Sequence, residues 1–130
     1  MPHSGIAIAL VDDDALLRDA LARLLEMSGM AVEQYHSGAD FLSAAPTSQA
    51  DCVVLDVQLG DISGIAVAQE LRASRPEFPI VFITGSMDPV FERQADEIDS
   101  AAFLRKPFLR DTLVEAIMAA TAARAENTDE

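Results

Sequence analysis

The feature of this sequence that most restricts its fold is a set of five short, apolar-rich runs, each followed by a segment with a helical pattern. Runs of about five residues that are apolar almost throughout are typical of strands buried on both faces of a sheet. The predicted strands are Ile6–Val11, Ala31–Tyr35, Asp51–Asp56, Ile80–Thr84 and Ala101–Leu104. Because strands that alternate with helices form parallel sheets covered on both faces, the sequence predicts an α/β fold with a five-stranded parallel sheet.

The segments between these runs carry the periodicity and the end signals of helices. Leu17 and Leu21 begin an apolar stripe along the first of them, which Gly29 ends. Asp88 and Pro89 have the residue types of an N-cap and of a first helical position. The predicted helices begin near Ala15, Ser37, Ile65, Asp88 and Leu109, with Ser37, Ser63 and Asp88 as their capping residues.

Length and composition indicate one domain with one core. The chain has 130 residues, of which 50% are hydrophobic, so it can bury a core of ordinary size for a single domain. We expect that domain to span residues 1–124, and residues 125–130 to form a polar tail or the start of a linker.

The charge and the cysteine content exclude several classes of function. A net charge of -13 disfavours direct binding of nucleic acid and of anionic membranes by this domain. The single cysteine, Cys52, excludes an internal disulfide and a multi-cysteine zinc site, and its apolar strand predicts a buried, inert thiol. His3 and His36 have no neighbour at a metal-ligand spacing. Because Ile6–Val11 is too short to span a membrane, we expect a cytoplasmic protein.

Polar residues follow several of the predicted strands at the point where each strand ends. They are Asp12, Asp13, Asp56, Thr84 and Lys106. Ligands of open parallel sheets bind beyond the carboxyl ends of the strands, so these side chains are candidates for one common site. Asp14, by contrast, is expected to cap the following helix.

Three aspartates at one edge of a sheet repel one another unless a cation neutralises them. An all-oxygen ligand set suits Mg²⁺. A metal ion beside Asp56 lets its carboxylate act as a nucleophile toward a phosphoryl group, while Thr84 and Lys106 contact the phosphoryl oxygens. Lys106 is the only lysine of the chain, beside eight arginines, and its compact ammonium fits a crowded site for metal and phosphate.

Four motifs together resemble the receiver domain of two-component response regulators over about residues 6–122. They are Val11-Asp-Asp-Asp14, Leu55-Asp56 with Gly64 eight residues later, Ile83-Thr84-Gly85, and Phe103-Leu-Arg-Lys106-Pro107. The resemblance implies a flavodoxin-like, doubly wound (βα)5 fold with strand order 2-1-3-4-5. It also implies that Asp56 accepts the phosphoryl group from a sensor histidine kinase or a phosphotransfer protein.

The resemblance further implies the roles of the residues around Asp56. Mg²⁺ is held by Asp13, Asp56 and the backbone carbonyl of Gln58, and Asp12 acts through water. Thr84 and Phe103 form a switch that reshapes the face made by the fourth helix, fifth strand and fifth helix, through which a homodimer can form. Gly85 leaves the phosphoryl pocket open, and Gln58 and Ser86 tune the lifetime of the aspartyl phosphate.

Two positions depart from the family pattern. Gly60 stands where the family usually has proline, which predicts a more mobile loop after the third strand and a less fixed metal-binding carbonyl. Ile98-Asp99-Ser100 replaces the usual Ala-Gly-Ala before the fifth strand, so Asp99 is expected in a left-handed or altered turn.

Two alternative functions remain open at this stage. An aspartate-nucleophile phosphohydrolase uses a similar residue set, but it needs an acid two residues after the nucleophile, where this chain has Gln58. A degenerate receiver that only binds partners disagrees with the complete set of acidic residues, Thr84 and Lys106. We expect no separate substrate turnover, and we favour the N-terminal part of a transcriptional regulator over a complete single-domain regulator.

Overall fold

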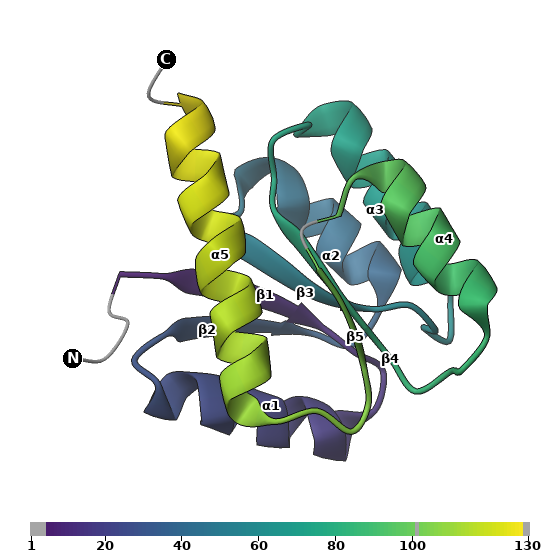
Figure 1. Cartoon of the computed structure of the whole chain (residues 1–130), viewed down its shortest axis with the longest axis horizontal. Coiled ribbons are helices and arrows are strands. Elements are labelled where there is room, and N and C mark those ends of the chain that lie inside the picture. The colour runs from purple at the N-terminus through teal and green to yellow at the C-terminus, as the bar shows by residue number, and fades with distance from the viewer. Residues whose placement is uncertain (1–4, 101, 129–130) are drawn as a thin grey trace.

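A computed structural model describes residues 5–100 and 102–128, with the side chains described as far as Arg124. Strands and helices alternate along the chain (Figure 1). The strands are β1 (Ala7–Val11), β2 (Ala31–Tyr35), β3 (Cys52–Asp56), β4 (Ile80–Thr84) and β5 (Ala102–Arg105). The helices are α1 (Ala15–Met27), α2 (Gly38–Ala44), α3 (Gly64–Ser74), α4 (Pro89–Ile98) and α5 (Arg110–Thr128), with a 3₁₀ turn, η1 (Ala45–Thr47), after α2.

The five strands form one parallel sheet in the order β2-β1-β3-β4-β5. The predicted fold class and strand order are therefore confirmed. The register pairs Val11 with Leu55, Asp56 with Ile83, and Thr84 with Arg105. Because all strands run the same way, their carboxyl ends lie at one edge of the sheet, where the predicted site residues follow them.

Two layers of side chains cover the two faces of the sheet, with α1 and α5 on one side and α2, α3 and α4 on the other (Figure 1). Successive residues of β1 alternate between these layers: Ile8 and Leu10 pack toward α1 and α5, and Ala9 and Val11 toward the opposite helices. All residues of β3 and β4 are buried, which is why these strands are apolar without alternation.

Side chains cap the first four α-helices as their sequences predict. Each capping oxygen accepts a hydrogen bond from a backbone N–H of the first turn, a group that has no partner within the helix. The capping residues are Asp14, Ser37, Ser63 and Asp88. At the other end of α4, Asp99 has φ 63° and ψ 49°, so the predicted left-handed turn is confirmed.

The structure also tests the expectations for Cys52, the histidines and the ends of the chain. Cys52 is buried, as predicted, and His36 lies at the surface 3.1 Å from Asp40. His3, Ala101 and residues 129–130 lie outside the described residues. The backbone of α5 continues to Thr128, beyond the expected domain boundary at residue 124, so the start of the predicted tail is helical. Among residues 5–100 and 102–128, none of the helices has the combination of length and hydropathy that a membrane-spanning segment needs.

Candidate functional site

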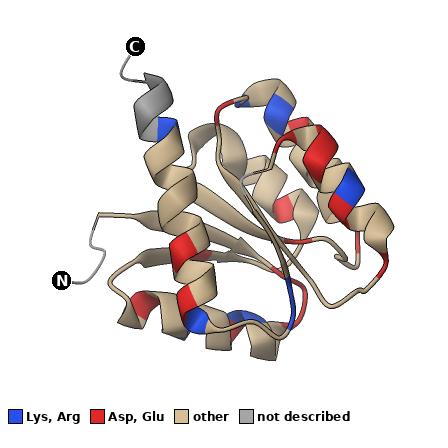
Figure 2. Cartoon of the chain, in the orientation of Figure 1, with Lys and Arg blue, Asp and Glu red and all other residues tan. Residues whose placement is uncertain are grey.

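The structure brings the predicted polar side chains together at the carboxyl edge of the sheet. Asp12 directly follows β1, Asp56 ends β3, Thr84 ends β4, and Lys106 directly follows β5. Asp12, Asp56 and Thr84 are the buried polar residues among those described. In Figure 2, a basic segment at the end of β5 (blue) lies beside an acidic segment after β1 (red).

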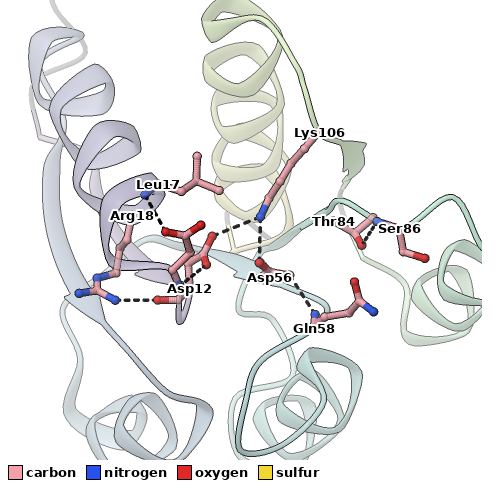
Figure 3. A network of polar contacts seen from close by, with 9 residues as sticks. Asp12, Leu17, Arg18, Asp56, Gln58, Thr84, Ser86 and Lys106 are labelled. Atoms are coloured by element: carbon pink, nitrogen blue, oxygen red, sulfur yellow. Dashed lines mark hydrogen bonds and ion pairs between the residues drawn. The ribbon is translucent and has the colours of Figure 1, made fainter.

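The ammonium of Lys106 contacts two of these carboxylates (Figure 3). Its Nζ donates to Asp56 Oδ2 at 2.9 Å and to Asp12 Oδ2 at 3.4 Å. The Lys106 side chain is 22% exposed, while that of Asp12 is fully buried. One cation therefore partly compensates two carboxylates that have little access to water.

Asp13 completes a group of three carboxylates. Oxygen atoms of Asp12, Asp13 and Asp56 all lie within 4.8 Å of one another, although Asp13 is exposed to solvent. Oxygen ligands with one open, solvated side suit a hard divalent cation that keeps some of its water. The donor set present at this edge therefore fits a Mg²⁺ ion.

Burial and charge act in opposite directions on the two central groups. Burial raises the pKa of Asp56 above its usual value, although hydrogen bonds from Lys106 and from the Gln58 backbone oppose this. Burial alone would lower the pKa of Lys106, but the hydrogen bond and charge of Asp56, together with Asp12, raise it. Lys106 therefore keeps its proton at neutral pH, and burial makes the negative charge of Asp56 costly unless a cation lies beside it.

The same local backbone geometry holds the polar side chain at three strand ends. Asp12 Oδ1 accepts from the Asp14 N–H at 2.9 Å, and Asp56 Oδ1 accepts from the Gln58 N–H at 2.9 Å. Thr84 Oγ1 accepts from the Ser86 N–H at 3.0 Å. In each case a short polar side chain turns back onto the residue two positions later, which restricts its rotamer locally. Asp12 and Asp56 have Lys106 as a distant partner in addition.

Gly64 is required by the backbone of Asp56. A Cβ at position 64 would lie 2.1 Å from the Asp56 carbonyl oxygen and 2.9 Å from the Val57 Cα, and neither backbone atom can yield easily. The Gly64 N–H also donates to the Val57 carbonyl at 2.7 Å. The glycine eight residues after Asp56 thus permits the start of α3 to pack directly against the end of β3.

The structure places the remaining predicted residues beside the carboxylate group rather than in it. Thr84 and Ser86 bond to each other on the β4 side of the site, as Figure 3 shows. A Cβ at Gly85 would have no atom within 4 Å, so this position borders open space. Phe103 packs on the α4 side of the sheet, with its ring centroid 6.4 Å from that of Phe82.

The geometry agrees with a comparison against known protein families. Residues 8–118 match the response regulator receiver domain. The chain belongs to this family. Among curated relatives of this receiver domain, it is 36% identical over 126 residues to the transcriptional regulatory protein FixJ of Azorhizobium caulinodans, covering 97% of this chain and 59% of that protein. It is 34% identical over 120 residues to the response regulator protein TodT of Pseudomonas putida, covering 92% of this chain and 53% of that protein.

Solved structures give the same assignment. Full-length FixJ from B. japonicum superposes on this receiver domain with a TM-score of 0.89 at 32% identity, covering 97% of this chain and 62% of that one. A CheY-like receiver domain from Methanospirillum hungatei has a TM-score of 0.88 at 21% identity, with 94% and 98% of the two chains covered, and supports the fold alone. The receiver domain spans a little over half the length of the curated relatives named above. It is thus related to transcriptional regulators that are longer than itself.

Sequence reasoning missed Arg18 as part of this receiver site. Its Nη1 donates to the Asp12 carbonyl oxygen at 2.8 Å, and its Nε donates to Gln34 Oε1 at 3.1 Å. Arg18 therefore links α1 to the end of β1, as Figure 3 shows, and also to β2 through Gln34. Its position one helical turn after the capping Asp14 was the available signal, but a basic residue on an exposed helix face is common and does not indicate such a contact.

Proposed function

We propose that this receiver domain is a Mg²⁺-dependent phospho-acceptor in which Asp56 takes a phosphoryl group from a sensor histidine kinase or a phosphotransfer protein. The observation that carries the proposal is the position of the Asp56 carboxylate. It lies 2.9 Å from the sole lysine of the chain and shares its edge of the sheet with Asp12 and Asp13. A nucleophilic carboxylate needs such neighbours, because they offset the charges that meet when it approaches a phosphoryl group.

The residues that would hold Mg²⁺ are Asp13, Asp56 and the backbone carbonyl of Gln58, with Asp12 acting through water. When bound, the ion neutralises the charge of the carboxylates and of the incoming phosphoryl oxygens. Asp56 is oriented by the Gln58 N–H on Oδ1 and by Lys106 on Oδ2. An Asp56 oxygen attacks phosphorus and forms the new O–P bond, while the N–P bond of the donor phosphohistidine breaks and leaves a histidine side chain.

Thr84, Ser86 and Lys106 act on the phosphoryl group after transfer. Lys106 contacts one phosphoryl oxygen, and the Thr84 hydroxyl leaves its bond with the Ser86 N–H to contact another. Since a side chain at Gly85 would meet no atom within 4 Å, the open space there admits the phosphoryl group. Gln58 and Ser86 border this space and influence how readily water reaches the aspartyl phosphate.

The switch couples the site to the face made by α4, β5 and α5. Movement of Thr84 changes the room available to Phe103, whose half-buried ring packs near Phe82 on the α4 side. This face then binds a partner or a second copy of the chain. By analogy with its longer relatives, the domain regulates transcription from the cytoplasm through a further domain, and it neither binds nucleic acid directly nor turns over a separate substrate.

Phosphorylation by acetyl phosphate tests the proposal. With Mg²⁺ present, intact-protein mass spectrometry should show one added phosphoryl group on the wild type and none on Asp56→Asn. Asp19→Asn, which removes an exposed carboxylate from α1, is the matched control and should be labelled like the wild type. Full labelling of Asp56→Asn would remove Asp56 as the acceptor.

A further inference from the structure

The loop between β3 and α3 is closed at its base by backbone pairing. Gln58 and Ser63 form an isolated antiparallel bridge, and the Gly64 N–H bonds the Val57 carbonyl just below it. Gly60 lies at the tip, where a residue without a side chain has the greatest backbone freedom. The loop carries the Gln58 carbonyl at its base and Gly60 at its tip, so both its base and its tip border the proposed metal site.

Asp61 ties this tip to α2. Its Oδ1 accepts from the Gly38 N–H at 3.1 Å, and its Oδ2 accepts from the Ala39 N–H at 2.9 Å. Both N–H groups belong to the first turn of α2, where no intrahelical acceptor exists. These bonds lower the pKa of the Asp61 carboxyl, so the group is ionised at neutral pH and makes charge-assisted hydrogen bonds.

A glycine makes this approach possible. A Cβ at Gly38 would lie 2.7 Å from Val67 Cγ2 and 2.8 Å from Ile62 Cγ1, so any side chain there would push α2 away from the loop and from α3. Gly38 is itself buried. The close packing of α2 on the loop is therefore independent evidence that the two segments form one unit.

The helix does not need Asp61 in order to begin. Ser37 already caps α2, since its Oγ accepts from the Asp40 N–H at 3.1 Å. The distinct consequence of the Asp61 contacts is thus for the loop. The tip they hold lies beside the acidic group, because a Cβ at Gly60 would be 3.2 Å from Asp13 Oδ2.

We infer that Asp61 is a positioning residue for the metal site: by tying the Gly60 tip to the start of α2, it holds the Gln58 carbonyl and the space beside Asp13 in the arrangement that binds Mg²⁺. This inference rests on the proposed function. Asp61 does not itself bind the metal in this proposal. Its hydrogen bonds to α2 restrict the position of the loop tip, which the glycine at position 60 leaves free to vary.

Titration of the full chain with Mg²⁺, followed by amide chemical shifts, tests the inference without phosphorylation. Asp61→Ala should raise the Mg²⁺ dissociation constant about tenfold, the lower end of the usual effect of losing a residue that orients metal ligands. Asp61→Asn should lie between wild type and Asp61→Ala, because its amide oxygen can still accept one of the two hydrogen bonds.

Ser37→Ala is the matched control, because it removes a cap from the same helix without touching the loop. It should lower the melting temperature by about 2–6 °C and leave the Mg²⁺ dissociation constant within about twofold of the wild type. Coupling also acts in the reverse direction, so Mg²⁺ should slow hydrogen exchange of the Gly38 and Ala39 amides in the wild type but not in Asp61→Ala.

The outcomes separate this inference from the proposed function. If the wild type binds Mg²⁺ and Asp61→Ala binds it equally well, the positioning role is wrong and the proposed function stands. If Ser37→Ala weakens binding as much as Asp61→Ala, the effect belongs to helix stability and the positioning role is again wrong. If the wild type binds no Mg²⁺, both proposals are removed.

Discussion

Lys106 Nζ lies 2.9 Å from Asp56 Oδ2, although the two residues are 50 positions apart in the chain. The parallel register creates this contact, because β3 and β5 both flank β4 and end at the same edge of the sheet. A second carboxylate, that of Asp12, shares the same ammonium at 3.4 Å. The site therefore holds more negative charge than its own cation neutralises.

Replacing Lys106 with methionine should have opposite effects on metal binding and on phosphorylation. Without the ammonium, the carboxylates of Asp12, Asp13 and Asp56 attract Mg²⁺ more strongly, so the dissociation constant should fall about fivefold. The rate of labelling by acetyl phosphate at saturating Mg²⁺ should fall by at least about tenfold, because a donor to the phosphoryl group is lost. Weaker Mg²⁺ binding by Lys106→Met would contradict the charge argument.

Asp56→Asn should stabilise the metal-free protein at neutral pH. Burial raises the pKa of Asp56 in the folded state, so folding binds a proton above the unfolded pKa, and the wild type loses stability as pH rises toward the folded pKa. Asparagine removes that cost, and Lys106 keeps Asp12 as a partner, so Asp56→Asn should be more stable than the wild type at pH 7.

Urea unfolding in the presence of a chelator, measured from pH 7 down to about pH 4, checks this prediction. The advantage of Asp56→Asn should shrink as the pH falls, because the wild-type carboxyl becomes protonated in both states. Asp19→Asn, which alters an exposed carboxylate, should show no comparable trend. An advantage that is the same at both ends of the pH range would be inconsistent with a buried charge as its cause.

Gly64→Ala should be strongly destabilising, whereas Gly85→Ala should be tolerated. The new Cβ at position 64 would meet the Asp56 carbonyl oxygen at 2.1 Å, which forces backbone to move at the end of β3, while no atom lies within 4 Å of the corresponding position at Gly85. Denaturant unfolding should show a loss of about 3 kcal/mol or more for Gly64→Ala and a change within about 0.5 kcal/mol for Gly85→Ala. Equal losses for the two variants would show that steric contact does not set the cost.

Most of the fold could be predicted because the information for it is local. Strands buried on both faces must be apolar throughout, so β1, β3 and β4 are visible as uninterrupted runs. At the edge of the sheet, β2 is only partly buried and its sequence is mixed, which gives a weaker signal. Caps such as Asp14 and Ser63 act on residues two or three positions away and are equally readable.

The parts of the site that could not be predicted depend on which distant atoms meet. The set of residues at the strand ends follows from topology, but the sharing of Lys106 between Asp56 and Asp12 depends on side-chain rotamers at three strand ends. Arg18 contacts the Asp12 carbonyl, and Asp61 contacts two backbone amides of α2. Every residue has a backbone carbonyl, and nearly every residue has an amide, so the residue types do not indicate which of these groups a side chain will contact. The expected mobility of the Gly60 loop stays a prediction.

Asp99→Gly should stabilise the protein, because Asp99 ends α4 in the left-handed region, with φ 63°. A side chain in this region clashes with its own backbone, whereas glycine adopts the conformation without that cost. Glycine also has more freedom in the unfolded chain, which offsets part of the gain. The expected net increase in stability is about 0.5–1 kcal/mol. The Asp99 carbonyl, which accepts from Arg72 Nη2 at 3.2 Å, is retained in the variant. Asp96→Gly is the matched control, since it also removes one exposed carboxylate but from a position within α4. It should lose a few tenths of a kcal/mol of stability, because glycine is a poorer helix former than aspartate. Urea unfolding should therefore give changes of opposite sign for the two variants, and a stabilisation of similar size in both would assign the gain to reduced negative charge instead of to the backbone at Asp99.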